Sequence, residues 1–443
     1  MLWSVSLSIL VGPLLILMMF GVPVAIAFFL IDLAGAYAFL GGERGFVSVV
    51  RGAMGSLANI NLAAIPLFLL MGELLFQTGL AMRAIDAIDR LITRVPGRLS
   101  VVAITGGTIF SALSGSTVAT TAMLGKSLLP EMLRRGYKPE MAMGPIIGVG
   151  GVDMLIPPSA LTVLLATLAS AVSLVKVSVT DLLIAGILPG LIMSALFILY
   201  IIITCWRRPD YSPASEVTAE TLFNRIKPFV IHVLPLFLLF FVVMGSMVAG
   251  LASPTDAAAL GCIAAAFLAA VFRKLTLKAV FDSIMQTAVV TAMVFFILAG
   301  STTFSQLLAF SGAVDGALAV IRSFELTPLM AVGMMVFILL ILGCLLDQIS
   351  TMLLTLPFFM PIANGLNLDL VWLGIVLLIS LQIGLLTPPF GMLLFVMRGV
   401  TPPEITTKQI WWAATPYTIM TFSVLVAVIF VPEIATYLPS VFK

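Results

Sequence analysis

The sequence predicts an all-α polytopic membrane protein whose two halves are inverted-topology repeats, each with a re-entrant hairpin and a broken helix. Composition is the first reason: 61% of the 443 residues are hydrophobic and 9% are charged, whereas soluble domains average about 25% charged residues. The second reason is a series of apolar segments near the length, about 20 residues, that crosses a bilayer as a helix. The third is a pair of glycine- and proline-rich interruptions, one in each half of the chain.

Continuous apolar segments predict most of the membrane-spanning helices. The chain has no basic region before its first apolar segment, so we expect that segment to be a span rather than a cleavable signal peptide. Short polar segments at 41–57 and 273–285 precede two of the spans. The expected continuous spans lie near residues 3–20, 22–40, 58–79, 181–206, 229–250, 254–272, 286–308 and 409–432.

Two further apolar segments, 139–174 and 369–398, are predicted to be broken helices. The first contains Gly148-Val-Gly-Gly-Val-Asp-Met-Leu-Ile-Pro-Pro-Ser159, and the second contains Gly384-Leu-Leu-Thr-Pro-Pro-Phe-Gly391. Proline lacks a backbone N–H and clashes with the preceding turn, and glycine loses the most entropy in a helix. Irregular backbone at membrane depth is tolerated only where protein buries it or where it lines a watery cavity, so both breaks are expected at a binding site.

Segments 98–133 and 328–362 are predicted to be re-entrant hairpins, because each has a polar middle between two short apolar arms. The polar middles, or tips, are Ser111-Ala-Leu-Ser-Gly-Ser-Thr-Val-Ala-Thr-Thr121 and Gly343-Cys-Leu-Leu-Asp-Gln-Ile-Ser-Thr351. Linkers at 80–97 and 309–327 precede the hairpins, and the first is clearly amphipathic. We expect both to lie along the membrane surface and to act as arms between the hairpins and a fixed scaffold.

Prolines indicate an internal repeat. Four pairs are each separated by 231 positions: Pro23 and Pro254, Pro130 and Pro361, Pro157 and Pro388, and Pro158 and Pro389. The order of spans, linker, hairpin and broken helix is the same in both halves. The repeat therefore divides the chain into a first scaffold helix (1–20), repeat 1 (21–228), a second scaffold helix (229–250) and repeat 2 (251–443).

The distribution of lysine and arginine predicts the orientation. If residues 80–98 face the cytoplasm, sixteen of the 22 Lys and Arg residues lie on that side and five on the other. Counting either hairpin as a full crossing would reverse every later segment and remove this asymmetry. We therefore expect inverted repeats, with both chain termini on the side of the membrane opposite the cytoplasm.

The hairpin tips carry the candidate ion-binding groups. The first tip offers hydroxyls and exposed carbonyls without charge, and these oxygen ligands suit a small hard cation such as sodium. Helix ends at the breaks add partial charges of either sign, for an ion or for an anionic substrate. The alternative is that small polar residues here only allow close helix packing. The residues concerned are Ser114, Gly115, Ser116, Thr117, Thr120 and Thr121.

Four acids in apolar segments need an explanation, because an unpaired carboxylate in a bilayer is costly. Asp347 is either a functional group or a helix cap within the second tip. Asp153 is an ion ligand, a proton carrier or a brace for exposed N–H groups in the first break. Asp32 and Glu73 are expected to brace helix–helix contacts.

The sequence lacks the common catalytic motifs. A single histidine, His232, excludes zinc motifs with two histidines, and there is no Gly-x-x-x-x-Gly-Lys-Ser/Thr loop for ATP. The three cysteines show no metal-binding or disulfide spacing. The chain is therefore not expected to be an enzyme or to bind a metal other than sodium, and transport would run on an ion gradient.

Several motifs spread over nearly the full length occur together: Ser114-Gly-Ser-Thr-Val-Ala, Leu129-Pro-Glu-Met-Leu-Arg-Arg-Gly-Tyr137, Leu155-Ile-Pro-Pro-Ser159, Ser253-Pro-Thr-Asp-Ala-Ala-Ala259, Gly343-Cys-Leu-Leu-Asp347 and Thr387-Pro-Pro-Phe-Gly391. In combination they resemble the large membrane subunit of tripartite ATP-independent periplasmic (TRAP) transporters of the dicarboxylate and sialic-acid uptake type. The resemblance implies sodium-driven uptake of a small organic anion, such as a C4-dicarboxylate or a sugar acid, by an elevator movement. It implies a bacterial inner (cytoplasmic) membrane, with both chain termini in the periplasm. It also implies an architecture like that of the ion transporter superfamily, a separate small four-helix membrane subunit and a periplasmic substrate-binding protein.

The resemblance also implies site residues. Sodium sites like those of the family would pair the first tip with the first break through Ser114, Gly115, Ser116, Thr117, Gly150 and Gly151. They would pair the second tip with the second break through Gly343, Asp347, Gly384 and Thr387. Substrate would lie between the tips, where the candidate contacts are Thr120, Asp153, Pro158, Ser159, Thr351 and Pro389.

One residue departs from the family pattern. Relatives often have glycine where this chain has Asp153, a difference that bears on ion stoichiometry or on the charge of the substrate. Two other functions stay open at this point. One is a stand-alone sodium- or proton-coupled anion carrier of similar architecture, as in divalent anion/sodium symporters, and the other is a channel.

Overall fold

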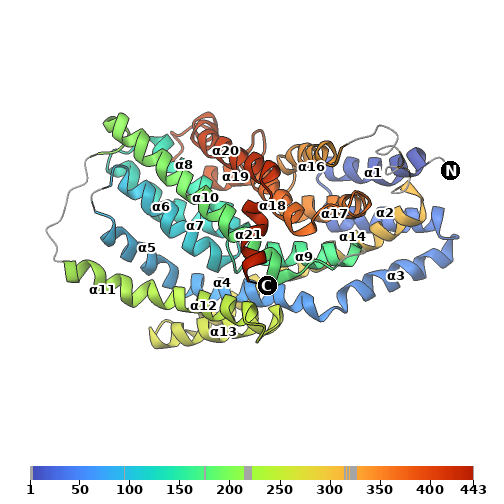
Figure 1. Ribbon diagram of the computed structural model, residues 1–443, viewed down its shortest axis with the longest axis horizontal. Coiled ribbons are helices and arrows are strands. Elements are labelled where there is room, and N and C mark those ends of the chain that lie inside the picture. Colours follow the sequence, from blue (N-terminus) through green and yellow to red (C-terminus); the bar gives the residue numbers. More distant parts are fainter. Residues whose placement is uncertain are drawn as a thin grey trace.

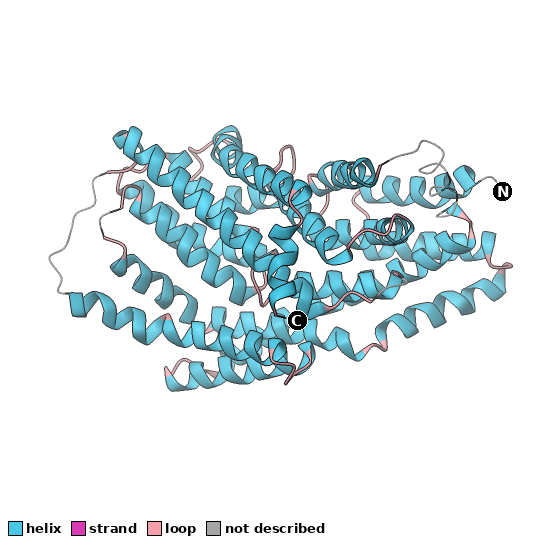
Figure 2. Ribbon diagram, in the orientation of Figure 1, coloured by secondary structure: helices cyan, strands magenta, loops and turns pink. Residues whose placement is uncertain are grey.

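The structure, a computed structural model, describes residues 3–93, 95–173, 176–213, 222–313, 316, 319 and 327–442. These residues form helices and loops and no strand (Figure 2), which confirms the all-α class. Within this part of the chain, five helices are long and apolar enough to cross a membrane. A sixth span is obtained if two helices that meet at a 64° bend, Ala64–Gln77 and Leu80–Leu91, are counted together.

The helices of the first half end close to glycine, proline or a capping residue. They are α1 (Trp3–Met19), α2 (Val24–Phe39), α3 (Glu43–Leu57), α4 (Ala64–Gln77), α5 (Leu80–Leu91), α6 (Arg98–Ser114), α7 (Thr117–Arg134), α8 (Pro139–Gly150), α9 (Ala160–Val172) and α10 (Val179–Arg207). Short 3₁₀ turns lie at Ile60–Ala63, Val152–Met154 and Pro209–Tyr211.

The second half has a similar succession of elements. Its helices, labelled as in Figure 1, are α11 (Leu222–His232), α12 (Leu234–Val248), α13 (Pro254–Val271), α14 (Leu277–Phe310), α16 (Pro328–Gly343), α17 (Gln348–Gly365), α18 (Leu370–Leu386), α19 (Met392–Val400), α20 (Thr407–Phe430) and α21 (Glu433–Val441).

Three expected elements differ from the structure or fall partly outside it. The polar segment 273–285 is not a separate arm, because α14 continues from Leu277 to Phe310 and has no proline or glycine before Gly300. The expected span 229–250 lies in a longer membrane-length helix, Phe223–Val248, in which a single residue near Pro235, Val233, separates α11 from α12. Most of the linker 309–327 lies outside the described residues.

Two helical hairpins and two interrupted helices form the centre of the molecule. Helices α6 and α7 are joined by Gly115 and Ser116, and α16 and α17 are joined by residues 344–347. The chain between α8 and α9 leaves the α-helical conformation at residues 151–159, and the chain between α18 and α19 leaves it at 387–391. In Figure 1 the first hairpin lies in the left half of the molecule and the second in the right half.

Close backbone contacts fix the first break against its neighbours. A Cβ atom at Gly186 of α10 would lie 2.1 Å from the Leu155 carbonyl oxygen, and one at Gly151 would lie 2.6 Å from the Gln382 side chain. Glycine is therefore needed at both positions for α10 and α18 to approach the break. The whole segment is buried, as irregular backbone at membrane depth requires.

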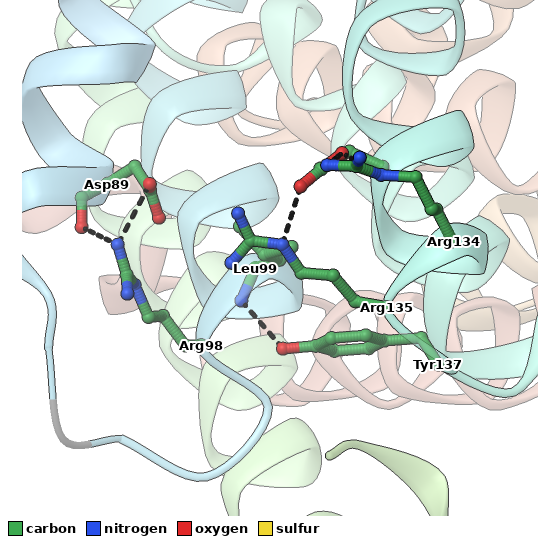
Figure 3. Close-up of polar contacts among 7 residues, drawn as sticks. Asp89, Arg98, Leu99, Arg134, Arg135 and Tyr137 are labelled. Carbon is green, nitrogen blue, oxygen red and sulfur yellow. Dashed lines mark hydrogen bonds and ion pairs between the residues drawn. The ribbon is translucent and has the colours of Figure 1, made fainter. Parts of the chain in front are cut away.

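The base of the first hairpin is tied to the amphipathic helix α5 (Figure 3). The Arg98 guanidinium donates hydrogen bonds to the Asp89 carboxylate at 2.9 Å and to the Asp89 carbonyl at 2.8 Å. The hydroxyl of Tyr137 accepts a hydrogen bond from the Leu99 backbone N–H at 3.2 Å. These contacts join α5, the start of α6 and the chain that follows α7, so α5 and the hairpin are expected to move together.

Arg98→Met should therefore lower the free energy of unfolding by about 1.5–3 kcal/mol, the usual contribution of a hydrogen bond to a charged group. The Arg98 side chain is only 13% exposed, and its removal leaves Asp89 without a cationic partner. The matched control is Arg134→Met, because the Arg134 side chain is 77% exposed and its partner Glu131 keeps Arg135. Exposed ion pairs contribute roughly 0–1 kcal/mol. Unfolding in detergent compares the two variants. Equal losses of stability would contradict a specific contribution of the Arg98–Asp89 contact.

Candidate functional site

The first tip is a tight turn closed by a helix cap. Gly115 ends α6 with φ +58°, a left-handed conformation that glycine adopts without strain. The Ser116 hydroxyl then accepts a hydrogen bond from the Ala119 N–H at 3.3 Å and caps the N-terminus of α7. This turn presents the first residues of α7 toward the second hairpin.

The second tip is capped by a carboxylate. One Asp347 oxygen accepts hydrogen bonds from the Ile349 and Ser350 backbone N–H groups, both at 3.0 Å, and the Ser350 hydroxyl donates to the other oxygen. The geometry is that of the helix cap expected as one alternative for Asp347. Its charge therefore lies at the positive end of α17.

The two tips are bridged by a chain of hydrogen bonds. The Gln348 amide donates to the Thr117 hydroxyl at 2.9 Å, and that hydroxyl lies 3.1 and 3.2 Å from the two Asp153 carboxylate oxygens. The consistent arrangement has Gln348 donating to Thr117, and Thr117 donating to Asp153. Thr117 and Gln348 open α7 and α17 and are 231 positions apart, the spacing of the proline pairs.

Asp153 is therefore a brace between the first break and the tips. Its side chain is 1% exposed, and both of its carboxylate oxygens lie within hydrogen-bond distance of the Thr117 hydroxyl. A shift of 231 positions aligns it with Gly384. At Gly384 the space is closed, since a Cβ atom there would lie 2.7 Å from the Gly343 Cα atom. At these two positions, 231 residues apart, the first half has a buried carboxylate and the second half has a close backbone contact.

A cavity of about 530 Å³ lies beside the bridge. The hairpin tips form one side and helices α4 and α14 the other, and the first turn of α9 also contributes. Its described lining contains two acidic side chains, Glu73 and Asp347, and no lysine, arginine or histidine. The other polar side chains that line it are Ser116, Thr117, Gln286, Thr287 and Gln348.

Four of the predicted site residues line this cavity: Gly115, Ser116, Thr117 and Asp347. The Ser114 side chain lies outside the described part of the structure. The remaining candidates are not among the residues that line the cavity: Thr120, Gly150, Gly151, Asp153, Pro158, Ser159, Gly343, Thr351, Gly384, Thr387 and Pro389.

Several of these residues have clear structural roles. Ser159 caps α9 by accepting a hydrogen bond from the Thr162 N–H at 3.3 Å. The Thr387 hydroxyl donates to the Ile383 carbonyl at 2.7 Å, at the end of α18. A Cβ atom at Gly150 would lie 2.1 Å from the Thr121 hydroxyl oxygen, so α7 and α8 are in close contact there.

Four polar residues of the lining were not predicted from the sequence as site residues: Glu73 of α4, Gln286 and Thr287 of α14, and Gln348 of α17. Gln348 could have been found, because it lies 231 positions after Thr117 in the opposite tip. Glu73 was expected to brace a helix–helix contact, but the hydrogen bond that it accepts, from Gln77 at 3.2 Å, lies within α4. Its position on the cavity depends on the packing of α4 against the tips.

The chain is similar to known proteins over most of its length. Residues 11–434 match the family model described as "Tripartite ATP-independent periplasmic transporter, DctM component". The chain belongs to this family. It is 31% identical to the C4-dicarboxylate TRAP transporter large permease protein DctM of Pseudomonas aeruginosa, over 86% of this chain and 87% of that protein. It is 29% identical to the ectoine/5-hydroxyectoine TRAP transporter large permease protein UehC of Ruegeria pomeroyi, over 96% of each.

These relatives are permeases, so this DctM-family chain is a multi-pass membrane transporter and not an enzyme. The structure is also similar to that of the Alcanivorax borkumensis YdaH transporter, with a TM-score of 0.62. That likeness covers 88% of this chain and 89% of the other at 15% identity, so it bears on the fold alone.

Proposed function

We propose that this chain takes up a small carboxylate-bearing solute across the bacterial inner membrane, driven by a sodium gradient. The observation that carries the proposal is the 530 Å³ cavity beside the Thr117–Gln348 bridge, in a chain of the TRAP large-permease family. Its volume suits a small metabolite, and it lies where two hairpin tips and a broken helix meet.

Alternating access by an elevator movement of inverted repeats is the proposed mechanism. The two hairpins lie in opposite halves of the molecule (Figure 1), and their tips meet through residues 231 positions apart. These features support two equivalent half-sites that exchange access between the two sides of the membrane. The contacts of α5 with the first hairpin support its proposed role as an arm.

Sodium is the proposed coupling ion. The groups at the tips and breaks are hydroxyls, carbonyls and carboxylates, the oxygen ligands that a hard cation binds. We propose one site at the first tip and break and a second at the second tip and break, with the ligands predicted from the sequence. Asp347 would then contribute charge to the second site while it caps α17.

The partners follow from the family. Its model is described as a component of a tripartite periplasmic transporter, so we propose a small membrane subunit and a periplasmic substrate-binding protein as the other two components. Relatives of similar identity are named for C4-dicarboxylates and for ectoine, so overall identity does not select the solute. A stand-alone carrier is the alternative, and co-purification of a small membrane subunit would argue against it.

The test is thermal unfolding of the purified chain in detergent, with sodium titrated against potassium and choline at constant ionic strength. Sodium at about 100 times its dissociation constant should add about 2.7 kcal/mol per site. Asp347→Asn should reduce this sodium-specific gain, because asparagine caps a helix about as well as aspartate but carries no charge. Failure of sodium to stabilise the chain would contradict the proposed coupling.

Asp369→Asn is the matched control. One Asp369 oxygen caps α18 by accepting hydrogen bonds from the Val371 and Trp372 N–H groups, at 2.8 and 3.0 Å, just as Asp347 caps α17. Asp369 is exposed and is not among the residues that line the cavity. Its variant should therefore keep the full sodium response, and an equal loss in both variants would assign the effect to capping.

A further inference from the structure

We infer that the transported solute carries a cationic group as well as its carboxylate, and that the cationic group binds Glu73. The inference rests on the proposed function, because it takes the 530 Å³ cavity as the substrate site. It names the charge of the substrate, which the similarity to other family members leaves open.

The charged side chains around the cavity are acidic. Among the described lining residues there are two carboxylates and no cationic side chain. Positive potential comes from the N-termini of α7, α9, α17 and α19, whose first residues line the cavity. The N-termini of α7 and α17 already have an anion of this chain beside them, since Asp153 accepts a hydrogen bond from the Thr117 hydroxyl and Asp347 accepts hydrogen bonds from the Ile349 and Ser350 amides. Within the described part of the chain, the N-termini of α9 and α19 have no carboxylate cap and remain for the carboxylate of the solute.

Asp153 makes the charge of the first break differ from that of the second. Its counterpart at a shift of 231 positions, Gly384, has no side chain. The aspartate therefore places a built-in carboxylate beside the α7 N-terminus, where it accepts a hydrogen bond from the Thr117 hydroxyl. This chain has less positive potential for a second substrate carboxylate than the helix ends alone would provide.

Glu73 is the carboxylate of the described cavity lining that caps no helix and has no cationic partner. It projects from α4, is partly buried and lines the cavity, and its hydrogen-bond donor is the neutral Gln77 amide at 3.2 Å. A carboxylate in this environment is costly unless a cation pairs with it. An ammonium or similar group of the solute is the partner that fits its position on the wall of the cavity.

The wall formed by α14 supplies groups for the rest of the solute. Thr287 is 7% exposed, lines the cavity, and its hydroxyl has no hydrogen-bond partner in the described structure. Buried hydroxyls normally find a partner, so this one indicates a polar ligand. Gln286 beside it and Gln348 at the second tip offer neutral donors for a single carboxylate.

The experiment measures binding by thermal stabilisation of the full-length chain in detergent and saturating sodium. The probes are pairs of compounds of similar length that differ in charge: β-alanine against succinate, and 4-aminobutyrate against glutarate. We expect the zwitterion of at least one pair to stabilise the wild-type chain at lower concentration than its dianion. Glu73→Gln should weaken zwitterion binding by about 10- to 100-fold, because a charged partner is lost, and Glu73→Asp should retain part of the preference.

Asp32→Asn is the matched control, since Asp32 is another buried intramembrane acid, on α2, and does not line the cavity. It should leave the preference unchanged. Binding of dianions in preference to zwitterions, or no binding of any zwitterion, would overturn the inference. A sodium midpoint that shifts in Glu73→Gln would also overturn it, because Glu73 would then pair with sodium. The proposed function fails separately, if sodium itself does not stabilise the wild-type chain.

Discussion

Gly384→Ala is expected to lower the free energy of unfolding by about 2–3 kcal/mol, the upper part of the range for overpacking. A Cβ atom at this position would lie 2.7 Å from the Cα atom and 2.8 Å from the carbonyl carbon of Gly343. Both obstructing atoms belong to the backbone, so no side chain can move aside. The second hairpin would have to separate from the second broken helix, and with it the proposed second sodium site would open. We therefore expect the sodium-dependent stabilisation to fall as well.

Gly384 lies in α18, and two glycines of α16, Gly343 and Gly333, provide graded controls for it. At Gly343 a Cβ atom would lie 3.1 Å from the Gly384 Cα atom, so alanine there should cost less than at Gly384. At Gly333 no atom lies within 4 Å, so alanine should be neutral or stabilise the helix by up to about 1 kcal/mol. Unfolding in detergent, with and without sodium, measures all three variants. If the Gly384→Ala and Gly333→Ala variants were equally stable, the backbones of α16 and α18 would not be in contact at Gly343 and Gly384.

The arrangement of the tips was accessible from the sequence because it depends on local chemistry. Clustered glycines and consecutive prolines favour interruption of a helix, so the breaks near Pro157 and Pro388 could be placed from the sequence, whereas single prolines such as Pro130 and Pro189 lie inside continuous helices. The proline spacing of 231 then related the two halves, and the contact between Thr117 and Gln348 has the same spacing. The cap formed by Asp347 was one of the two alternatives that the sequence left open for this residue.

The residues of the cavity wall opposite the tips could not be predicted in this way. Glu73 and Thr287 belong to α4 and α14, which are more than 200 residues apart and reach the cavity only through tertiary packing. An acid in an apolar helix can face a neighbouring helix or a cavity, and the sequence pattern is the same in both cases. The continuity of α14 was also missed, because polar residues at 273–285 suggested a separate arm although no helix-breaking residue divides them from the span.

Thr117→Val is expected to lower the free energy of unfolding by about 1.5–3 kcal/mol, because it removes a hydrogen bond to a charged, buried acceptor. Valine has nearly the same shape, so packing is retained while Asp153 loses its side-chain donor and the Gln348 amide loses its acceptor. Thr117→Ser keeps the hydroxyl and should be close to wild type. If both variants were equally stable, the bridge would contribute nothing to holding the tips together.

A double-mutant cycle separates the two bonds of the bridge. Combined with Thr117→Val, Gln348→Leu should add little, because the Thr117 hydroxyl that its amide binds at 2.9 Å is already gone. Asp153→Leu in the wild-type background removes the buried carboxylate together with its need for a donor, so Thr117→Val should cost much less in that background. Additive effects of Thr117→Val and Asp153→Leu would contradict a direct contact. Coupled effects would show that one threonine joins both hairpin tips to the first break, so that the two half-sites on either side of it are held together as one unit.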